Sequence, residues 1–182
     1  MNEHIMNEHL RIQTITTADV NNGTGFRVTV WVSGCTHRCP ECHNAWLQNY
    51  MLGKPMPEVK KKIFDTLSNH NIDGITFSGG DPLDQSVAAL QELANLLGEI
   101  HEKFPQKTIW MYTGCVYEDV VAIFIYKNIL KYVDVLVDGL YDKTLRDITL
   151  PFRGSSNQRI IDVQKSLEKN KCCIIDDSTF KL

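Results

Sequence analysis

Two spacings of apolar residues alternate along the chain, one typical of buried strands and the other of helices. Short runs rich in β-branched and aromatic residues predict strands at 26–32, 73–78, 108–112 and 133–137. Apolar residues that recur every three or four positions predict helices at 57–69, 87–100 and 118–130. This alternation favours an α/β fold with a mainly parallel sheet, built from βαβ units with right-handed crossovers.

The periodic pattern weakens after Asp138. Residues 140–182 contain the short apolar piece Ile160-Ile161 but no sustained period, so we expect a functional loop followed by a tail. No Ser- or Pro-rich linker divides the 182 residues. This length suits one domain and falls short of the roughly 250 residues of a complete eight-stranded α/β barrel. We therefore expect a single domain over 1–182, with a cysteine-rich loop at 34–46.

Composition and charge narrow the class of protein. The chain is 43% hydrophobic and 23% charged, with a net charge of −3, as expected for an ordinary globular protein. The basic run Lys60 to Lys62 lies in a helical pattern and is expected to face solvent, so nucleic-acid binding is not indicated. The sequence has neither the signal-peptide pattern at its start nor a run of about 18 apolar residues. We expect a cytoplasmic protein that does not bind a membrane.

The six cysteines are better candidates for metal ligation or burial than for disulfides in such a reducing compartment. Cys35, Cys39 and Cys42 follow the first predicted strand with the spacing Cys-x3-Cys-x2-Cys. Three thiolates on a tight loop can hold three irons of a four-iron cluster, and the open fourth position is typical of a catalytic site. The other three cysteines are expected to be buried or incidental thiols: Cys115, Cys172 and Cys173.

Spacing alone leaves other kinds of site open. A structural zinc ion could be bound by Cys39 and Cys42 together with His37 or His43. The loop could also belong to a simple electron carrier, or the three cysteines could be unligated.

Further motifs follow in order along the chain. Ser78-Gly79-Gly80-Asp81-Pro82 ends the second predicted strand, about 40 residues after the cysteines, and Tyr112-Thr113-Gly114 ends the third. The segments 134–139 and 149–159 complete the set. With these motifs, residues 26–165 resemble the radical S-adenosylmethionine superfamily, and within it the activating proteins of anaerobic ribonucleoside-triphosphate reductase.

This resemblance implies an incomplete (β/α) barrel with a [4Fe-4S] cluster on Cys35, Cys39 and Cys42. It implies that S-adenosyl-L-methionine chelates the open iron and is reductively cleaved, giving a radical that takes hydrogen from a glycine of the reductase. The chain would then be an oxidoreductase that acts on the glycyl-radical-bearing subunit. A small electron donor such as flavodoxin or ferredoxin would supply the electron, and no catalytic residue beyond the cluster and cofactor is expected.

The same resemblance implies a set of cofactor-binding residues. Gly79 and Gly80, which lack side chains, would let the backbone approach the methionine moiety, with Asp81 facing its ammonium group. Locally, Asp81-Pro82 also fits a helix start. The other residues expected at the cofactor are Thr113 and Asp138, near its carboxylate and ribose, and His43, near its adenine.

Two features of the resemblance are unexplained by chemistry alone. Glu41 stands where many superfamily members have an aromatic residue before the third cysteine, and the last motif contains Arg153, Asn157 and Arg159, whose role is unassigned. The alternatives to an activase of this reductase are another small radical enzyme, either a pyruvate formate-lyase-type activase or a deazapurine-forming enzyme, and a non-catalytic zinc or iron–sulfur binding protein.

Overall fold

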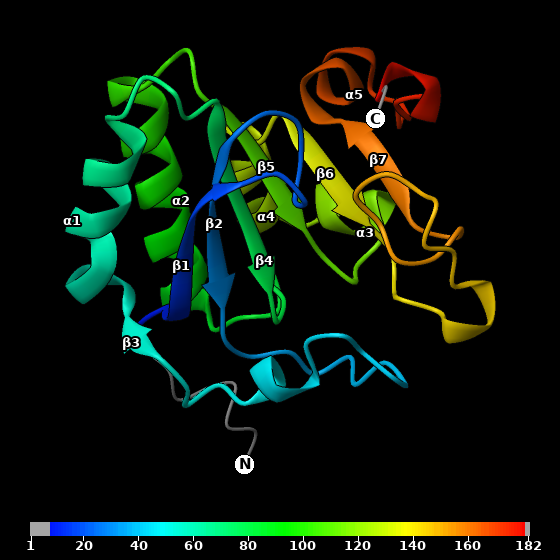
Figure 1. Ribbon diagram of the computed structural model, residues 1–182, viewed down its shortest axis with the longest axis horizontal. Helices are drawn as coiled ribbons and strands as arrows, with labels where there is room; N and C mark the ends of the chain where they lie inside the picture. The colour runs from blue at the N-terminus through cyan, green and yellow to red at the C-terminus, as the bar shows by residue number, and fades with distance from the viewer. Residues whose placement is uncertain (1–7, 181–182) are drawn as a thin grey trace.

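A seven-stranded sheet organises residues 8–180, which are the residues that the computed structural model describes (Figure 1). The strand order is β3-β1-β2-β4-β5-β6-β7. The central pairs β2–β4, β4–β5 and β5–β6 are parallel, and the outer pairs are antiparallel. The strands are β1 (Arg11–Asp19), β2 (Arg27–Val32), β3 (Lys54–Pro55), β4 (Gly74–Gly79), β5 (Thr108–Tyr112), β6 (Val135–Asp138) and β7 (Arg159–Asp162). The α/β class and the parallel centre of the sheet are confirmed.

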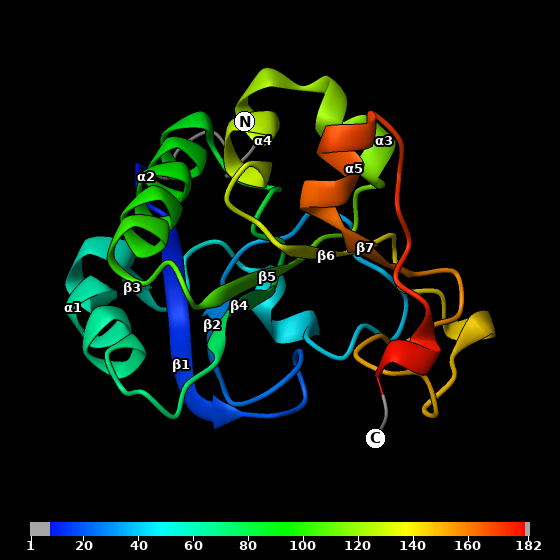
Figure 2. The same cartoon turned by 90° about the horizontal axis from the view of Figure 1, so that it is seen from above.

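The helices follow the outer side of the curved sheet, and the irregular loops lie on its other side (Figure 2). Helix α2 shows why: its apolar stripe, which includes Leu90, Leu93 and Leu97, is buried, and Ser86 caps its first turn. The α-helices are α1 (Met56–Leu67), α2 (Val87–Lys103), α3 (Tyr117–Ala122), α4 (Phe124–Leu130) and α5 (Val163–Lys169). The short 3₁₀ helices are η2 (Ala45–Gln48), η3 (Lys143–Leu145) and η4 (Asp177–Thr179).

The structure differs from the sequence predictions in three places. The helix expected over 118–130 is two helices, because Ile123 has an extended conformation (φ −100°, ψ 122°) and the β-branched residues around it favour helix weakly. The C-terminal stretch is more regular than expected, since it forms β7 and α5, with Asp162 capping the helix. Strand β1 was not predicted, because two register shifts interrupt its alternation of buried and exposed residues.

No helix in the described part of the chain is long and apolar enough to cross a membrane. The residues on which the signal-peptide expectation depends, 1–7, lie outside the described residues.

A buried arginine links three parallel strands near their amino ends. The Arg27 side chain is fully buried, and its guanidinium donates hydrogen bonds to Thr76 Oγ1 (2.7 Å), Ile75 O (2.7 Å) and Thr108 O (2.8 Å). It also lies over the Trp110 ring, 5.3 Å from the ring centre. Burial lowers the pKa of Arg27 to about 10. This residue therefore joins β2, β4 and β5 at the edge opposite the cysteine loop.

Replacing Arg27 by Met should lower the free energy of unfolding of the metal-free protein by about 3 kcal/mol, because the substitution leaves several buried acceptors without a donor. Urea denaturation measures this change, with Lys62→Met on the exposed face of α1 as the matched control. A loss within about 0.5 kcal/mol, the range typical of surface substitutions, would contradict a structural role for the guanidinium.

Candidate functional site

The carboxyl ends of β2, β4, β5 and β6 meet at one edge of the sheet, the lower edge in Figure 1. The cysteine loop leaves the end of β2, and the Gly80-Asp81 turn leaves the end of β4. Thr113 and Gly114 follow β5. In parallel sheets this edge is where ligand sites are built, because loops from several strands converge there.

The carboxylate of Asp81 connects three of these loops. Asp81 is only 1% exposed. Its Oδ2 accepts hydrogen bonds from Thr113 Oγ1 (2.9 Å) and from the amide of Gly114 (2.8 Å), both from the end of β5. The same oxygen lies 2.8 Å from His37 Nε2 in the cysteine loop, and Oδ1 accepts from the amide of Leu83 (2.8 Å). Sequence reasoning predicted that Asp81 and Thr113 share the site, and the structure brings them into direct contact.

His37 packs into a recess formed by a glycine. A Cβ atom on Gly114 would lie 2.5 Å from the His37 ring, so only glycine admits the ring at this position. The hydrogen bond to Asp81 raises the pKa of His37 to about 10, which favours an imidazolium at neutral pH. Cys115 Sγ is 4.0 Å from His37 Nε2. Cys115, expected from the sequence to be a buried or incidental thiol, is partly buried and lies against the cysteine loop.

The cysteine loop presents three partly exposed thiols, Cys35, Cys39 and Cys42. Arg38 and Glu41 have left-handed conformations, with φ of 49° and 55°, so the chain turns sharply before Cys39 and again before Cys42. The amide of Cys42 donates to Cys39 O (3.2 Å), which closes the second turn. The three cysteines thus lie on one short, tightly turned segment.

Burial raises the pKa of the Cys35 thiol to about 12. At neutral pH this sulfur stays protonated unless a cation compensates its charge, and a bound metal does so because thiolates are the species that ligate metals.

The start of the loop is fixed by contacts that sequence reasoning missed. Gln85 Nε2 donates to the carbonyl oxygens of Ser33 (3.2 Å), Gly34 (3.2 Å) and Asp81 (2.8 Å). Gly34 has φ of 102°, and a Cβ there would lie 2.0 Å from the Tyr50 ring. Ser33 and Gly34 lie 52 and 51 residues from Gln85 along the chain, so no local pattern in the sequence reveals these two contacts.

Asp84 binds the next part of the same loop. Its Oδ2 accepts from the amide and hydroxyl of Thr36, and from the hydroxyl of Tyr50 (3.0 Å). The residues just after Asp81 therefore hold both the beginning and the first turn of the cysteine loop.

Gly79 and Gly80 let β4 approach the backbone of the neighbouring strand. A Cβ on Gly80 would lie 2.3 Å from Gly34 O, and one on Gly79, where φ is 107°, would lie 2.6 Å from Val32 O. The amide of Gly80 donates to Val32 O at 2.7 Å. The need for glycine thus has a reason within the protein itself, and the approach of these residues to a cofactor stays a prediction.

Asp138 lies at the end of β6 in a separate network of charges. It is fully buried, and it accepts hydrogen bonds from Arg159 Nε (2.9 Å) and from the amide of Tyr117 (2.7 Å). Arg159 also pairs with both carboxylate oxygens of Glu118, and the two acids raise its pKa. The structure therefore gives Arg159 a partner on β6 but does not join Asp138 to Asp81 by a hydrogen bond.

The other two residues of the last motif shape the C-terminal loop. Both terminal nitrogens of Arg153 donate to the carboxylate of Asp177, at 2.6 and 2.5 Å, and so tie the loop to η4. Asn157 Nδ2 donates to Leu140 O (2.7 Å), which folds the loop back on its start.

His43 and Glu41 lie on the exposed side of the cysteine loop. Glu41 Oε1 pairs with Lys143 Nζ (2.6 Å) on η3, and this pairing lowers the pKa of Glu41. The C-terminal loop is thereby linked to the segment between the second and third cysteines. His43 has an exposed ring, and its predicted place beside adenine remains a prediction.

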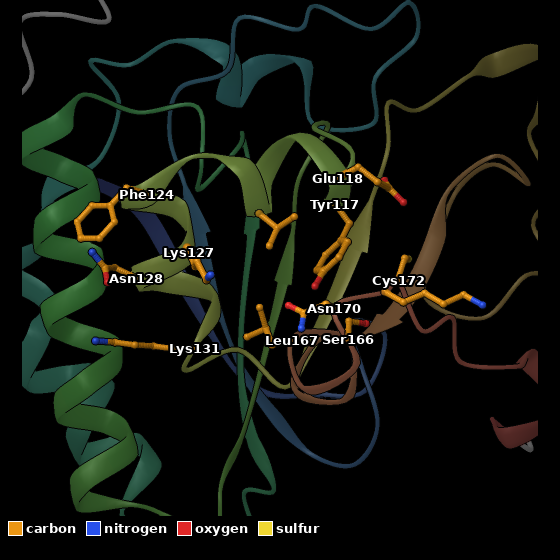
Figure 3. Close-up of a pocket in the computed structure, with 12 residues that line it drawn as sticks. Tyr117, Glu118, Phe124, Lys127, Asn128, Lys131, Ser166, Leu167, Asn170 and Cys172 are labelled. Carbon is orange, nitrogen blue, oxygen red and sulfur yellow. The ribbon is translucent and has the colours of Figure 1, made fainter.

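A pocket of about 670 Å³ lies elsewhere, between α3, α4 and α5 (Figure 3). Its lining includes Tyr117, Lys127, Leu167 and Cys172. Among the residues that the structure describes, none of those predicted to bind metal or cofactor lines it. This pocket is therefore distinct from the carboxyl edge where the cysteines lie.

Known proteins resemble this chain over most of its length. A family model described as a 4Fe-4S single cluster domain matches residues 21–161. The anaerobic ribonucleoside-triphosphate reductase-activating protein of Enterobacteria phage T4 is 39% identical over 143 residues, covering 78% of this chain and 87% of the relative. Proteins of the same name from Pasteurella multocida (strain Pm70) and Escherichia coli (strain K12) are each 36% identical, covering 78% and 77% of this chain and 90% of each relative.

The chain belongs to this family of reductase-activating proteins. Both the cysteine loop and the Asp81 turn fall inside the matched 4Fe-4S domain, as do the ends of β5 and β6. The family resemblance drawn from the motifs is confirmed.

Replacing Gly80 by Ala should destabilise the metal-free protein by at least about 2 kcal/mol, because the added methyl overlaps backbone atoms that cannot move independently. Gly154→Ala is the matched control. Its methyl would meet only side-chain atoms among its nearest neighbours, the Tyr141 ring at 3.2 Å and Gln158 Oε1 at 3.7 Å, and should cost less than about 1 kcal/mol. Urea denaturation compares the two variants. Equal losses would show that the close approach of β4 to the loop is not required.

Proposed function

We propose that the chain is a radical S-adenosylmethionine activase that generates a glycyl radical on an anaerobic ribonucleoside-triphosphate reductase. The observation that carries this proposal is the set of three partly exposed thiols on one tightly turned loop at the carboxyl edge of a parallel sheet, inside a 4Fe-4S single cluster domain. The relatives are named for activating this reductase, and that name supplies the partner.

The donor set fits a [4Fe-4S] cluster with one iron left open. Cys35, Cys39 and Cys42 would hold three irons. Burial disfavours the thiolate of Cys35, and the charge of a bound metal would stabilise it. The buried Ser33 hydroxyl, directly before the loop, has no hydrogen-bond partner in the described part of the chain, as expected beside a polar ligand. An open iron suits chelation by the amino and carboxylate groups of S-adenosylmethionine.

The loops at the carboxyl edge would bind this cofactor. Gly79, Gly80 and Asp81 end β4 beside the cysteine loop, and Thr113 follows the adjacent strand, in contact with Asp81. Asp138, at the end of the next strand, is held in place by Arg159 and would lie near the ribose. The site residues still expected at the cofactor are these five together with His43, next to the third cysteine.

The sheet is consistent with an incomplete (β/α) barrel of the radical S-adenosylmethionine type. It is curved, its helices lie on the outer side, and its two edge regions are antiparallel (Figure 2). An open-sided fold of this kind leaves room for a loop of a large partner protein, which a closed barrel does not.

A cluster held by Cys35, Cys39 and Cys42 would supply the electron for reductive cleavage of S-adenosylmethionine, and the resulting radical chemistry would remove hydrogen from a glycine of the reductase. The protein's own residues orient the cofactor and exclude water from the site. A small donor such as flavodoxin or ferredoxin would deliver the electron.

Anaerobic reconstitution tests this activity. The protein loaded with iron and sulfide, reduced and supplied with S-adenosylmethionine and the reductase, should form 5′-deoxyadenosine and a glycyl radical detectable by electron paramagnetic resonance. A glycine-containing peptide from pyruvate formate-lyase in place of the reductase should react more weakly. Absence of cleavage under these conditions would overturn the proposal, and one bound zinc without iron or sulfide would favour a structural metal site.

Substituting the cysteines one at a time tests the ligand set. Cys35→Ala, Cys39→Ala and Cys42→Ala should each abolish cluster absorbance, because each removes a thiolate ligand. Cys115→Ala, Cys172→Ala and Cys173→Ala should retain the iron content of the unmodified protein. Loss of the cluster in any of these last three variants would show that the ligand set is wrong.

A further inference from the structure

His37 is directed into the protein from the exposed part of the cysteine loop. It lies midway between the first two cysteines, and both of its sequence neighbours, Thr36 and Arg38, are exposed. The His37 side chain is 21% exposed, and its Nε2 is 2.8 Å from a carboxylate oxygen that is almost completely buried. Because a carboxylate can only accept, the imidazole nitrogen is the donor.

The recess that receives this ring is specific in shape. Gly114 leaves the space that the ring occupies, and Thr113 Oγ1 and the Gly114 amide donate to the same oxygen of Asp81 as His37 does. The position of that oxygen is therefore fixed by β5, independently of the cysteine loop. A fixed buried acceptor of this kind adds a second anchor to the segment between Cys35 and Cys39, in which Thr36 is already held by Asp84.

We propose that His37 is a positioning residue, whose hydrogen bond to Asp81 holds the segment between Cys35 and Cys39 in its cluster-binding shape before any cluster is present. This inference rests on the proposed function, which assigns Cys35, Cys39 and Cys42 as the cluster ligands. Without the His37 anchor, the part of the segment that follows Thr36 would have to be ordered at the moment the cluster binds, and that loss of conformational entropy would weaken cluster retention.

The same contacts assign a role to the Asp81 carboxylate. Oδ2 accepts three hydrogen bonds and Oδ1 accepts one, so both oxygens are already engaged within the protein. Oδ1 accepts a single hydrogen bond, so it keeps a lone pair that an ammonium group of the cofactor could use. Asp81 therefore joins the loops around the site and still has an acceptor position for the cofactor.

Two substitutions of His37 separate the hydrogen bond from the bulk of the ring. His37→Gln keeps a donor on a side chain of similar reach, and His37→Leu keeps the bulk but has no donor. His70, exposed between α1 and β4, is the matched control as His70→Leu. Urea denaturation of each metal-free variant shows whether the whole fold survives.

Hydrogen exchange of the metal-free protein measures the anchor directly. In His37→Leu, amides in 34–45 should exchange about tenfold faster or more, the effect expected on losing a hydrogen bond to a charged group, while the core strands are unchanged. In His37→Gln and His70→Leu, exchange of the same amides should stay close to that of the unmodified protein. Equal exchange in all four proteins would overturn the proposal.

Cluster loading provides the second readout. After identical reconstitution, His37→Leu should retain less iron and sulfide per chain and give an altered electron paramagnetic resonance signal on reduction, and His37→Gln should restore both. If His37→Gln behaves like His37→Leu with its fold intact, the hydrogen bond is not the cause and the proposal fails. The exchange measurement needs neither S-adenosylmethionine nor the reductase, so failure of the activase reaction is distinguishable from failure of the anchor.

Discussion

The carboxylate of Asp81 is the interaction on which the carboxyl edge of this protein depends. A buried charge is stable only when it is fully hydrogen-bonded, and here its four donors come from the loops that follow β2, β4 and β5. Satisfying that one group therefore brings three separate loops together. The cysteine loop, which has little apolar surface of its own, acquires its shape from this buried contact and from the neighbouring Gln85 and Asp84.

Close backbone packing makes this arrangement possible. Gly34, Gly80 and Gly114 each lie where a Cβ would overlap another part of the site, within 2.0 to 2.5 Å. At the other edge of the sheet, buried Arg27 hydrogen-bonds to two neighbouring strands. The protein thus has a buried ionisable group at each end of its parallel strands: a cation joins the amino ends, and an anion organises the carboxyl ends where the chemistry is proposed.

Sequence reasoning could predict the parts of this structure that have a local signal. The central strands and α2 have clear apolar periods, and the cysteines and the Gly-Gly-Asp turn stand out by composition and spacing. Strand β1 has no such period because its register shifts twice. Helices α3 and α4 were predicted as one helix because Ile123, where the helix breaks, is itself apolar and so leaves the apolar pattern uninterrupted. The site's internal contacts are also invisible locally: His37 was considered only as a zinc ligand, and Gln85 was not considered.

The family comparison and the geometry support different parts of the account. The comparison places the chain among reductase-activating proteins with a 4Fe-4S domain, and the geometry explains how three cysteines can be held on an exposed loop. The central claim that links them is that one iron of the cluster is left open for S-adenosylmethionine. Mössbauer spectroscopy of the ⁵⁷Fe-loaded protein tests this claim most directly. Addition of S-adenosylmethionine should shift the signal of one iron in four and leave the other three unchanged, whereas an unchanged spectrum would contradict the claim.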